Sequence, residues 1–80
     1  MDIDVARHII RQSFRIGRDL QDVMLFLKER CEPDDYNQYA IDIATAIDAV
    51  NTALLKRAIT AYPDLEKEIE EQIRAYGRYL

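Results

Sequence analysis

The chain has 80 residues, with eleven basic and fifteen acidic side chains and a formal net charge of −4. This length predicts one domain with a small core, because a chain of this size buries only about 60% of its unfolded surface. The net negative charge argues against a protein whose whole surface binds nucleic acid.

The single cysteine, Cys31, excludes an internal disulfide. The longest apolar run, VMLFL, is far shorter than the roughly 20 residues that span a membrane. The N-terminal residues MDIDVARH carry acids where a signal peptide carries basic residues and an apolar run. The sequence therefore predicts a cytoplasmic protein in a reducing compartment, with no membrane partner.

The first predicted helix covers about residues 3–30 and begins after Asp2, whose side chain suits an N-cap. Apolar residues keep helical spacing on both sides of Gly17, which favours a continuous helix although glycine costs about 1 kcal/mol relative to alanine. A kink or a helix in two pieces at this glycine is the alternative. The expected inward-facing seam consists of Ile9, Ser13, Ile16, Leu20, Val23 and Leu27.

Four arginines follow the polar side of this first helix with no acid between them: Arg7, Arg11, Arg15 and Arg18. Helical spacing places them within about 80° of one another. Two interpretations are open, a stripe that binds an anion such as a nucleic-acid backbone, or a stripe that pairs with carboxylates elsewhere in the chain. What lies opposite the stripe decides between them.

A second helix is predicted over about residues 33–60. Proline suits the first helical position and acids suit the positive end of the helix dipole, so Pro33, Asp34 and Asp35 mark its start. Because the connecting turn is short, this helix is expected to run antiparallel to the first. Its expected seam is Tyr36, Tyr39, Ile43, Ile47, Val50 and Leu54.

The third predicted helix covers about residues 64–77, from the acid after Pro63 to Gly77, a suitable end signal. Its narrow apolar face is surrounded by acids. Returning from the end of the second helix, it is expected to pass along residues 7–18 and bring these acids to the arginines. A charge network is therefore the favoured interpretation of the arginine stripe, although each exposed pair is worth only about 0–1 kcal/mol.

The third helix is about half as long as the other two, roughly 20 Å against 40 Å, so it cannot cover the half of the hairpin near the turn. Apolar side chains gather there, and an exposed apolar patch usually marks an interface. A two-fold homodimer that forms a helical bundle is the expected solution. The predicted interface residues are Val23, Met24, Leu25, Phe26, Tyr36, Tyr39 and Ile43.

No catalytic, cofactor-binding or metal-binding residue is expected. His8 is the only histidine and has no second ligand at suitable spacing, and Cys31 has no histidine to activate it. The two glycines, Gly17 and Gly77, cannot form a phosphate-binding loop.

The sequence thus predicts an all-α chain with a long antiparallel hairpin and a shorter third helix. Its expected role is non-enzymatic, a protein-interaction or regulatory module whose partners are a second copy of itself and an unidentified protein. The alternative is a nucleic-acid-binding protein that uses the four arginines, which the net charge and the lack of interleaved aromatic residues disfavour.

Overall fold

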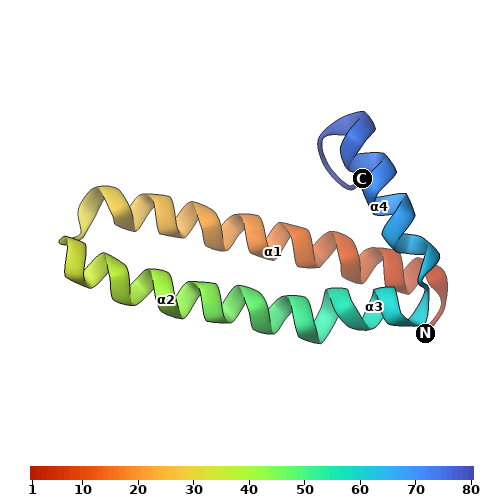
Figure 1. Ribbon diagram of the computed structural model, residues 1–80, viewed down its shortest axis with the longest axis horizontal. Coiled ribbons are helices and arrows are strands. Elements are labelled where there is room, and N and C mark those ends of the chain that lie inside the picture. Colours follow the sequence, from red (N-terminus) through yellow and green to blue (C-terminus); the bar gives the residue numbers. More distant parts are fainter.

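The computed structural model describes residues 1–80 and contains helices and turns only. Two long helical arms lie antiparallel, and a third, shorter helix leaves one end of the hairpin at a steep angle (Figure 1). We call that end the base and the end with the turn between the arms the tip. The molecule is 44 Å long with a radius of gyration of 14.8 Å, whereas a compact chain of this length has about 12 Å.

The first arm is helix α1, Ile3–Arg30, and has the predicted bounds. The Asp2 side chain accepts a hydrogen bond of 2.9 Å from the backbone N–H of Val5, which confirms it as the N-cap. The helix continues through Gly17 without a break, as predicted, so the alternative of a helix in two pieces is wrong.

The second arm is divided where the sequence predicts one regular helix. It consists of α2, Pro33–Val50, a π-helical turn η1, Asn51–Leu55, and α3, Lys56–Ala61. The less exposed residues Val50, Leu54, Ala58 and Tyr62 follow at intervals of four, whereas a turn of α-helix holds 3.6. A π-helical turn holds an additional residue and keeps these side chains directed toward the first arm.

The seam between the arms differs from the predicted one at four positions, where Ile10, Gly17, Met24 and Ala40 take the places of Ile9, Ile16, Val23 and Tyr39. Val23 and Tyr39 are about half exposed, and their neighbours Met24 and Ala40 are the less exposed residues. One row of less exposed positions on α1 alternates between steps of four and three residues, the spacing of paired helices. This row consists of Ala6, Ile10, Ser13, Gly17, Leu20, Met24 and Leu27, and it continues to the C-cap residue Cys31.

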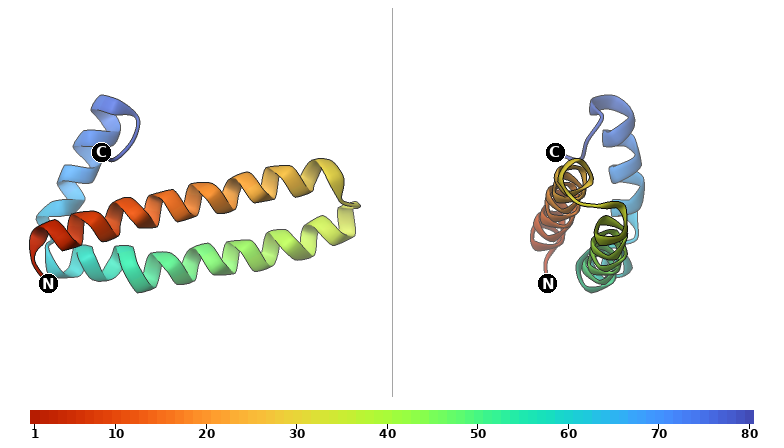
Figure 2. Two further views of the ribbon diagram at one scale, coloured as in Figure 1. Left: turned by 180° about the vertical axis from the view of Figure 1, so that it is seen from behind. Right: turned by 90° about the vertical axis from the view of Figure 1, so that its left-hand side faces the viewer.

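Helix α4, Asp64–Tyr76, ends at Gly77, whose φ of 75° is the left-handed conformation of a helix C-cap. The helix does not pass along residues 7–18, which corrects the prediction. Figure 2 shows it leaving the hairpin steeply, while the last residues turn back toward α1. The reason is that only its first half is buried: Leu65 and Ile69 lie in the core, whereas Ile73 and Tyr76 are 46% and 64% exposed.

The core is small and lies entirely at the base. It consists of five apolar residues, Ala6, Ile10, Ala58, Leu65 and Ile69, and the buried Ser13 lies beside it. The hydroxyl of Ser13 donates to the carbonyl of Ile9 over 2.8 Å, so no polar group is buried without a partner. The alanines at positions 6 and 58 let the two arms approach closely enough for α4 to pack on both.

Gly17 has a helical backbone that alanine also adopts, whereas Gly77 has a positive φ that alanine disfavours. Alanine substitutions at the two positions should therefore change the stability in opposite directions. A Cβ at Gly17 would meet no atom within 4 Å. Gly17→Ala should therefore raise the free energy of unfolding by about 0.5–1 kcal/mol, since alanine favours the helix. Gly77→Ala should lower it by about 1 kcal/mol, because a side chain disfavours positive φ. Urea denaturation followed by circular dichroism measures both changes, and destabilisation by Gly17→Ala would contradict the first expectation.

Candidate functional site

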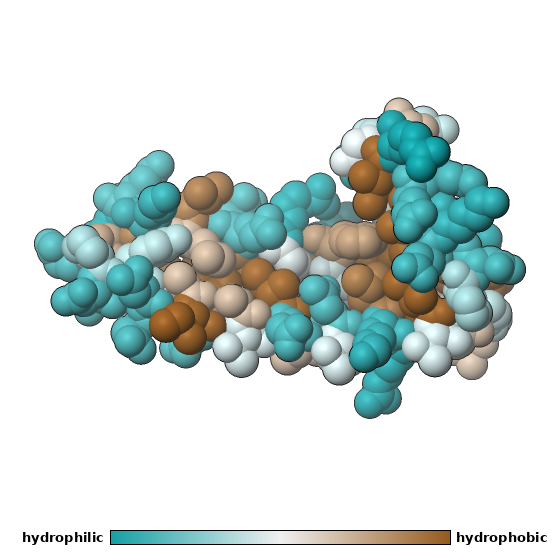
Figure 3. Space-filling view, viewed as in Figure 1, coloured by the Kyte–Doolittle hydropathy of each residue, from teal (hydrophilic) through white to brown (hydrophobic).

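The predicted interface residues all lie at the tip, on the parts of α1 and α2 that flank the turn. Val23, Leu25, Phe26 and Tyr39 are 45%, 62%, 53% and 51% exposed. The remaining three, Met24, Tyr36 and Ile43, are half-buried. Figure 3 shows apolar side chains on the surface of this half of the hairpin, among hydrophilic ones. No residue of this half is fully buried.

These tip residues do not form one continuous face. One face of the two-helix layer is marked by Phe14, which contacts Tyr79 in the segment after α4. Leu25 lies on this same face, three helical turns further along α1. Val23 lies on the opposite face of the two-helix layer, in line with Ile16 and Ile9 at intervals of seven residues.

The second arm adds to the face that carries Val23. Helical projection from the seam places Tyr39, and Ala46 seven residues later, on that side of the layer. Both are exposed. We call this surface the open face and define it by Ile9, Ile16, Val23, Tyr39 and Ala46, of which Ile9 is already partly buried against the core.

Two further exposed residues of the tip, Phe26 and Ile41, do not belong to the open face. The guanidinium of Arg30 lies over the ring of Phe26, 4.4 Å from its centroid, so this ring is partly covered within the chain. Ile41 of α2 is 60% exposed. Its place beside the turn makes it a further apolar residue of the tip, which the projection from sequence did not include.

Arg7 is the one member of the arginine stripe that pairs with acids. Its Nε donates to Glu68 of α4 over 3.2 Å, and its Nη1 lies 3.4 Å from Asp4. The hydroxyl of Tyr79 also donates to Glu68, over 2.9 Å. This cluster links the first turn of α1 to α4 and to the segment after it.

The Arg7–Glu68–Tyr79 cluster shifts the pKa of each member. Partial burial disfavours the charged form of Glu68, but hydrogen bonds from Arg7 and Tyr79 outweigh it and lower the pKa of this carboxyl. The hydrogen bond to Glu68, together with its charge, raises the pKa of Arg7. Burial, followed by the hydrogen bond to Glu68, raises the pKa of the Tyr79 phenol.

The remaining arginines of the stripe meet no acidic side chain, so the predicted charge network with the acids of α4 is wrong for them. Arg11 donates from Nε to the backbone carbonyl of Leu80 over 3.0 Å, and its guanidinium lies 5.9 Å from the centroid of the Tyr79 ring. Arg15 and Arg18 form no ion pair. The steep angle of α4 explains the difference, because it carries the acids of this helix away from the second and third turns of the stripe.

Two adjoining hollows lie between this part of α1 and the segment after α4. The first, about 220 Å³, is lined by Arg11, Arg15, Arg18, Arg78, Tyr79 and Leu80. The second, about 210 Å³, shares Arg11, Arg18, Arg78 and Tyr79, and adds the side chains of Phe14 and Ile73 beside Gly77. Arg78 was not among the predicted site residues. The signal for it is Gly77, whose left-handed conformation turns the chain back toward α1.

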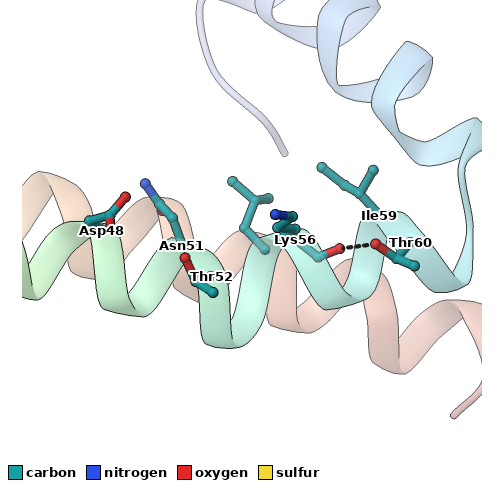
Figure 4. A pocket seen from close by; sticks show the side chains of 7 residues that line it. Asp48, Asn51, Thr52, Lys56, Ile59 and Thr60 are labelled. Carbon is teal, nitrogen blue, oxygen red and sulfur yellow. Dashed lines mark hydrogen bonds between the residues drawn. The ribbon is translucent and has the colours of Figure 1, made fainter.

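The largest hollow lies elsewhere, along η1 and α3, with a volume of about 520 Å³ (Figure 4). It is lined by Asp48, Asn51, Thr52, Leu55, Lys56, Ile59 and Thr60. The hydroxyl of Thr60 donates to the backbone carbonyl of Lys56 over 2.8 Å, a bond within the helix. The hollow contains none of the predicted site residues and no cluster of like-charged side chains.

The structure contains no group of three or more histidine, cysteine, aspartate or glutamate side chains arranged to hold a metal ion. None of its helices combines the length and apolar character needed to cross a membrane. No known family, curated protein or solved structure matches the chain, so its function is argued from its own residues.

The ion pair between Arg7 and Glu68 should make stability depend on pH. Because the pKa of Glu68 is lowered by folding, its contribution is complete above the ordinary value of 4.5 and is lost as the pH falls through the lower value in the folded chain. Glu68→Gln should therefore lower the free energy of unfolding at pH 7 by about 1 kcal/mol or less, as expected for a partly exposed pair. The difference from the parent should shrink as the pH falls below 4.5. Thermal unfolding across this range measures it, and a difference independent of pH would contradict the assignment.

Proposed function

We propose that the chain is a homodimeric helical interaction module without catalytic activity, in which the open face of one copy packs against that of a second. The observation that carries this proposal is the absence of any fully buried residue in the tip half of the hairpin. Two helices alone expose most of their apolar surface, and a second pair of helices is the usual way to enclose it.

The accessible surface of the chain is large enough to include the area that a dimer would bury. The chain has an accessible surface of 5985 Å². A compact monomeric protein of the same mass exposes about 5,000 Å². The difference, about 1,000 Å², is close to the roughly 800 Å² that each partner buries in a stable complex.

The pattern of the open face supports a self-complementary contact. Ile9, Ile16 and Val23 form a row at the heptad spacing by which helices pack in bundles. The small Ala46 on the neighbouring arm leaves room for a helix of the partner. The same face on both copies can meet across a two-fold axis, and α4 lies on the other side of the layer, where it does not obstruct this contact.

A dimer of this kind supports a binding or regulatory role. It displays two copies of α4 and of the surface around it on the outside of a four-helix bundle. An unidentified protein partner would engage that outer surface.

The first test is the molar mass in solution at micromolar concentration, by sedimentation equilibrium or light scattering. The parent should have twice the monomer mass of 9.4 kDa. Val23→Lys should yield a monomer, because a charge would then face its symmetry mate across the axis. The helix content of this variant should stay near that of the parent, since Val23 is already half exposed.

Leu25→Lys is the matched control, because Leu25, although it is among the interface residues predicted from the sequence, lies outside the open face proposed as the contact. It makes the same change in charge two residues away on the same helix, at a side chain that is also exposed but lies on the opposite face of the layer. Its molar mass should equal that of the parent. A monodisperse parent of 9.4 kDa would refute the dimer, and dissociation by both variants alike would refute the open face as its interface.

A further inference from the structure

Four arginines line one hollow that has no acidic side chain, and the main-chain oxygen of Leu80, the last residue, accepts a hydrogen bond from one of them. Arg11, Arg15 and Arg18 come from successive turns of α1, and Arg78 comes from the segment after α4. All four line the same hollow, which contains no acidic side chain. The nearest acid on α4 that reaches α1, Glu68, is already bonded by Arg7 and Tyr79. In a chain of net charge −4, this local excess of positive charge stands apart from the rest of the surface.

Hydrogen bonds hold the two sides of this hollow in place. The bond from Arg11 to the carbonyl of Leu80 uses Nε and leaves both terminal nitrogens of the guanidinium free to donate. The backbone N–H of Leu80 donates to the side-chain oxygen of Gln72 over 2.8 Å. Tyr79 is tied to Glu68 over 2.9 Å. The segment that carries Arg78 is therefore anchored at both residues that follow it.

The lining of the adjoining hollow is partly apolar. Phe14 and Ile73 contribute apolar surface to it, and the ring of Tyr79 lies 6.2 Å from that of Phe14. Arg11, Arg18, Arg78 and Tyr79 line both hollows, so a ligand can occupy them together. The site thus joins a positively charged compartment to a partly apolar one.

We propose that these hollows bind a phosphate monoester, with the phosphate among the four arginines and its apolar or aromatic substituent against Phe14 and Ile73. Guanidinium groups donate paired hydrogen bonds that match phosphate oxygens. A phosphate monoester carries a charge of about −1.5 to −2 at neutral pH, which several arginines together can balance. The site is independent of the proposed dimer, since it lies at the base and on the face of α4.

The size of the hollows favours a compact ligand over a nucleic-acid strand. Each is about 210–220 Å³, below the range of about 300–1,000 Å³ that encloses a whole drug-sized ligand. A strand is bound through phosphates spread along a groove, with aromatic side chains on which successive bases stack. Here the arginines surround one place, and the aromatic residues beside it, Phe14 and Tyr79, contact each other.

Phenyl phosphate is the probe that tests both compartments, with inorganic phosphate and phenyl sulfate for comparison. Titration of the isotope-labelled protein, followed by its amide and arginine side-chain NMR signals, gives the affinity and the place of binding. Phenyl phosphate should bind more tightly than inorganic phosphate, which lacks the ring, and more tightly than phenyl sulfate, which carries a single charge. The shifts should centre on residues 11–18 and 73–80.

Three variants separate the parts of the site. Arg15→Gln and Arg78→Gln should each weaken phenyl phosphate about tenfold, the value of one charge-assisted hydrogen bond. Ile73→Thr should weaken phenyl phosphate and leave inorganic phosphate unchanged. Arg57→Gln, an exposed arginine of α3 outside both hollows, is the control for net charge and should bind like the parent. Circular dichroism verifies that each variant is folded, and because Arg15 is exposed its substitution leaves the core intact.

Two further probes distinguish the source of the phosphate group. Adenosine monophosphate represents nucleotides, and a short phosphotyrosine peptide represents modified proteins. Tighter binding of either identifies the source. The proposal is overturned if phenyl phosphate produces no saturable shift at millimolar concentration, or if Arg57→Gln weakens it as much as Arg78→Gln. It is also overturned if a single-stranded oligonucleotide binds to the arginines and the monoesters do not.

Discussion

The close approach of the two arms at Ala6 and Ala58 is the contact on which the rest of the structure depends. Both residues are completely buried, and larger side chains there would separate α1 from α3. Leu65 and Ile69 of α4 complete the enclosure of Ile10 between the arms. The direction of α4, the return of the last residues to α1 and the gathering of arginines all follow from this one small core.

Apolar burial, more than charge, decides where α4 lies. Enclosing a side chain such as Ile10 or Leu65 is worth about 1.5–3 kcal/mol, whereas an exposed ion pair contributes about 0–1 kcal/mol. The acids of α4 would gain little by lying along the arginine stripe, and two buried side chains in its first half are enough to hold it at an angle. The ion pair between Arg7 and Glu68 forms where that angle allows it.

Local signals in the sequence were sufficient to predict where the helices begin and end. Asp2, Pro33 and Gly77 act within a few residues of their own positions, and the structure has the helix ends that they indicate. The apolar spacing across Gly17 likewise predicted an unbroken helix.

The features that sequence could not provide depend on contacts between distant residues. The π-helical turn arises because Val50, Leu54 and Ala58 must all face α1, which spacing within one helix does not reveal. For the same reason the predicted direction of the seam was wrong by about one residue: Ile10, Gly17, Met24 and Ala40 lie where Ile9, Ile16, Val23 and Tyr39 were expected. The hollow lined by four arginines could not be predicted without knowing the angle of α4, because Arg78 is 60 or more residues along the chain from the arginines of α1.

The π-helical turn has a consequence for how the two ends of the hairpin can change. An additional residue in a helix rotates everything beyond it by about 100° about the helix axis. At Asn51–Leu55 this rotation separates the orientation of α3, which is bound into the core, from that of α2, which is not. A one-residue insertion or deletion at this turn would therefore rotate the less exposed side of α2, with Ile43, Ile47 and Val50, away from α1. The length of this turn thus couples the orientation of the tip to the part of the chain that forms the core.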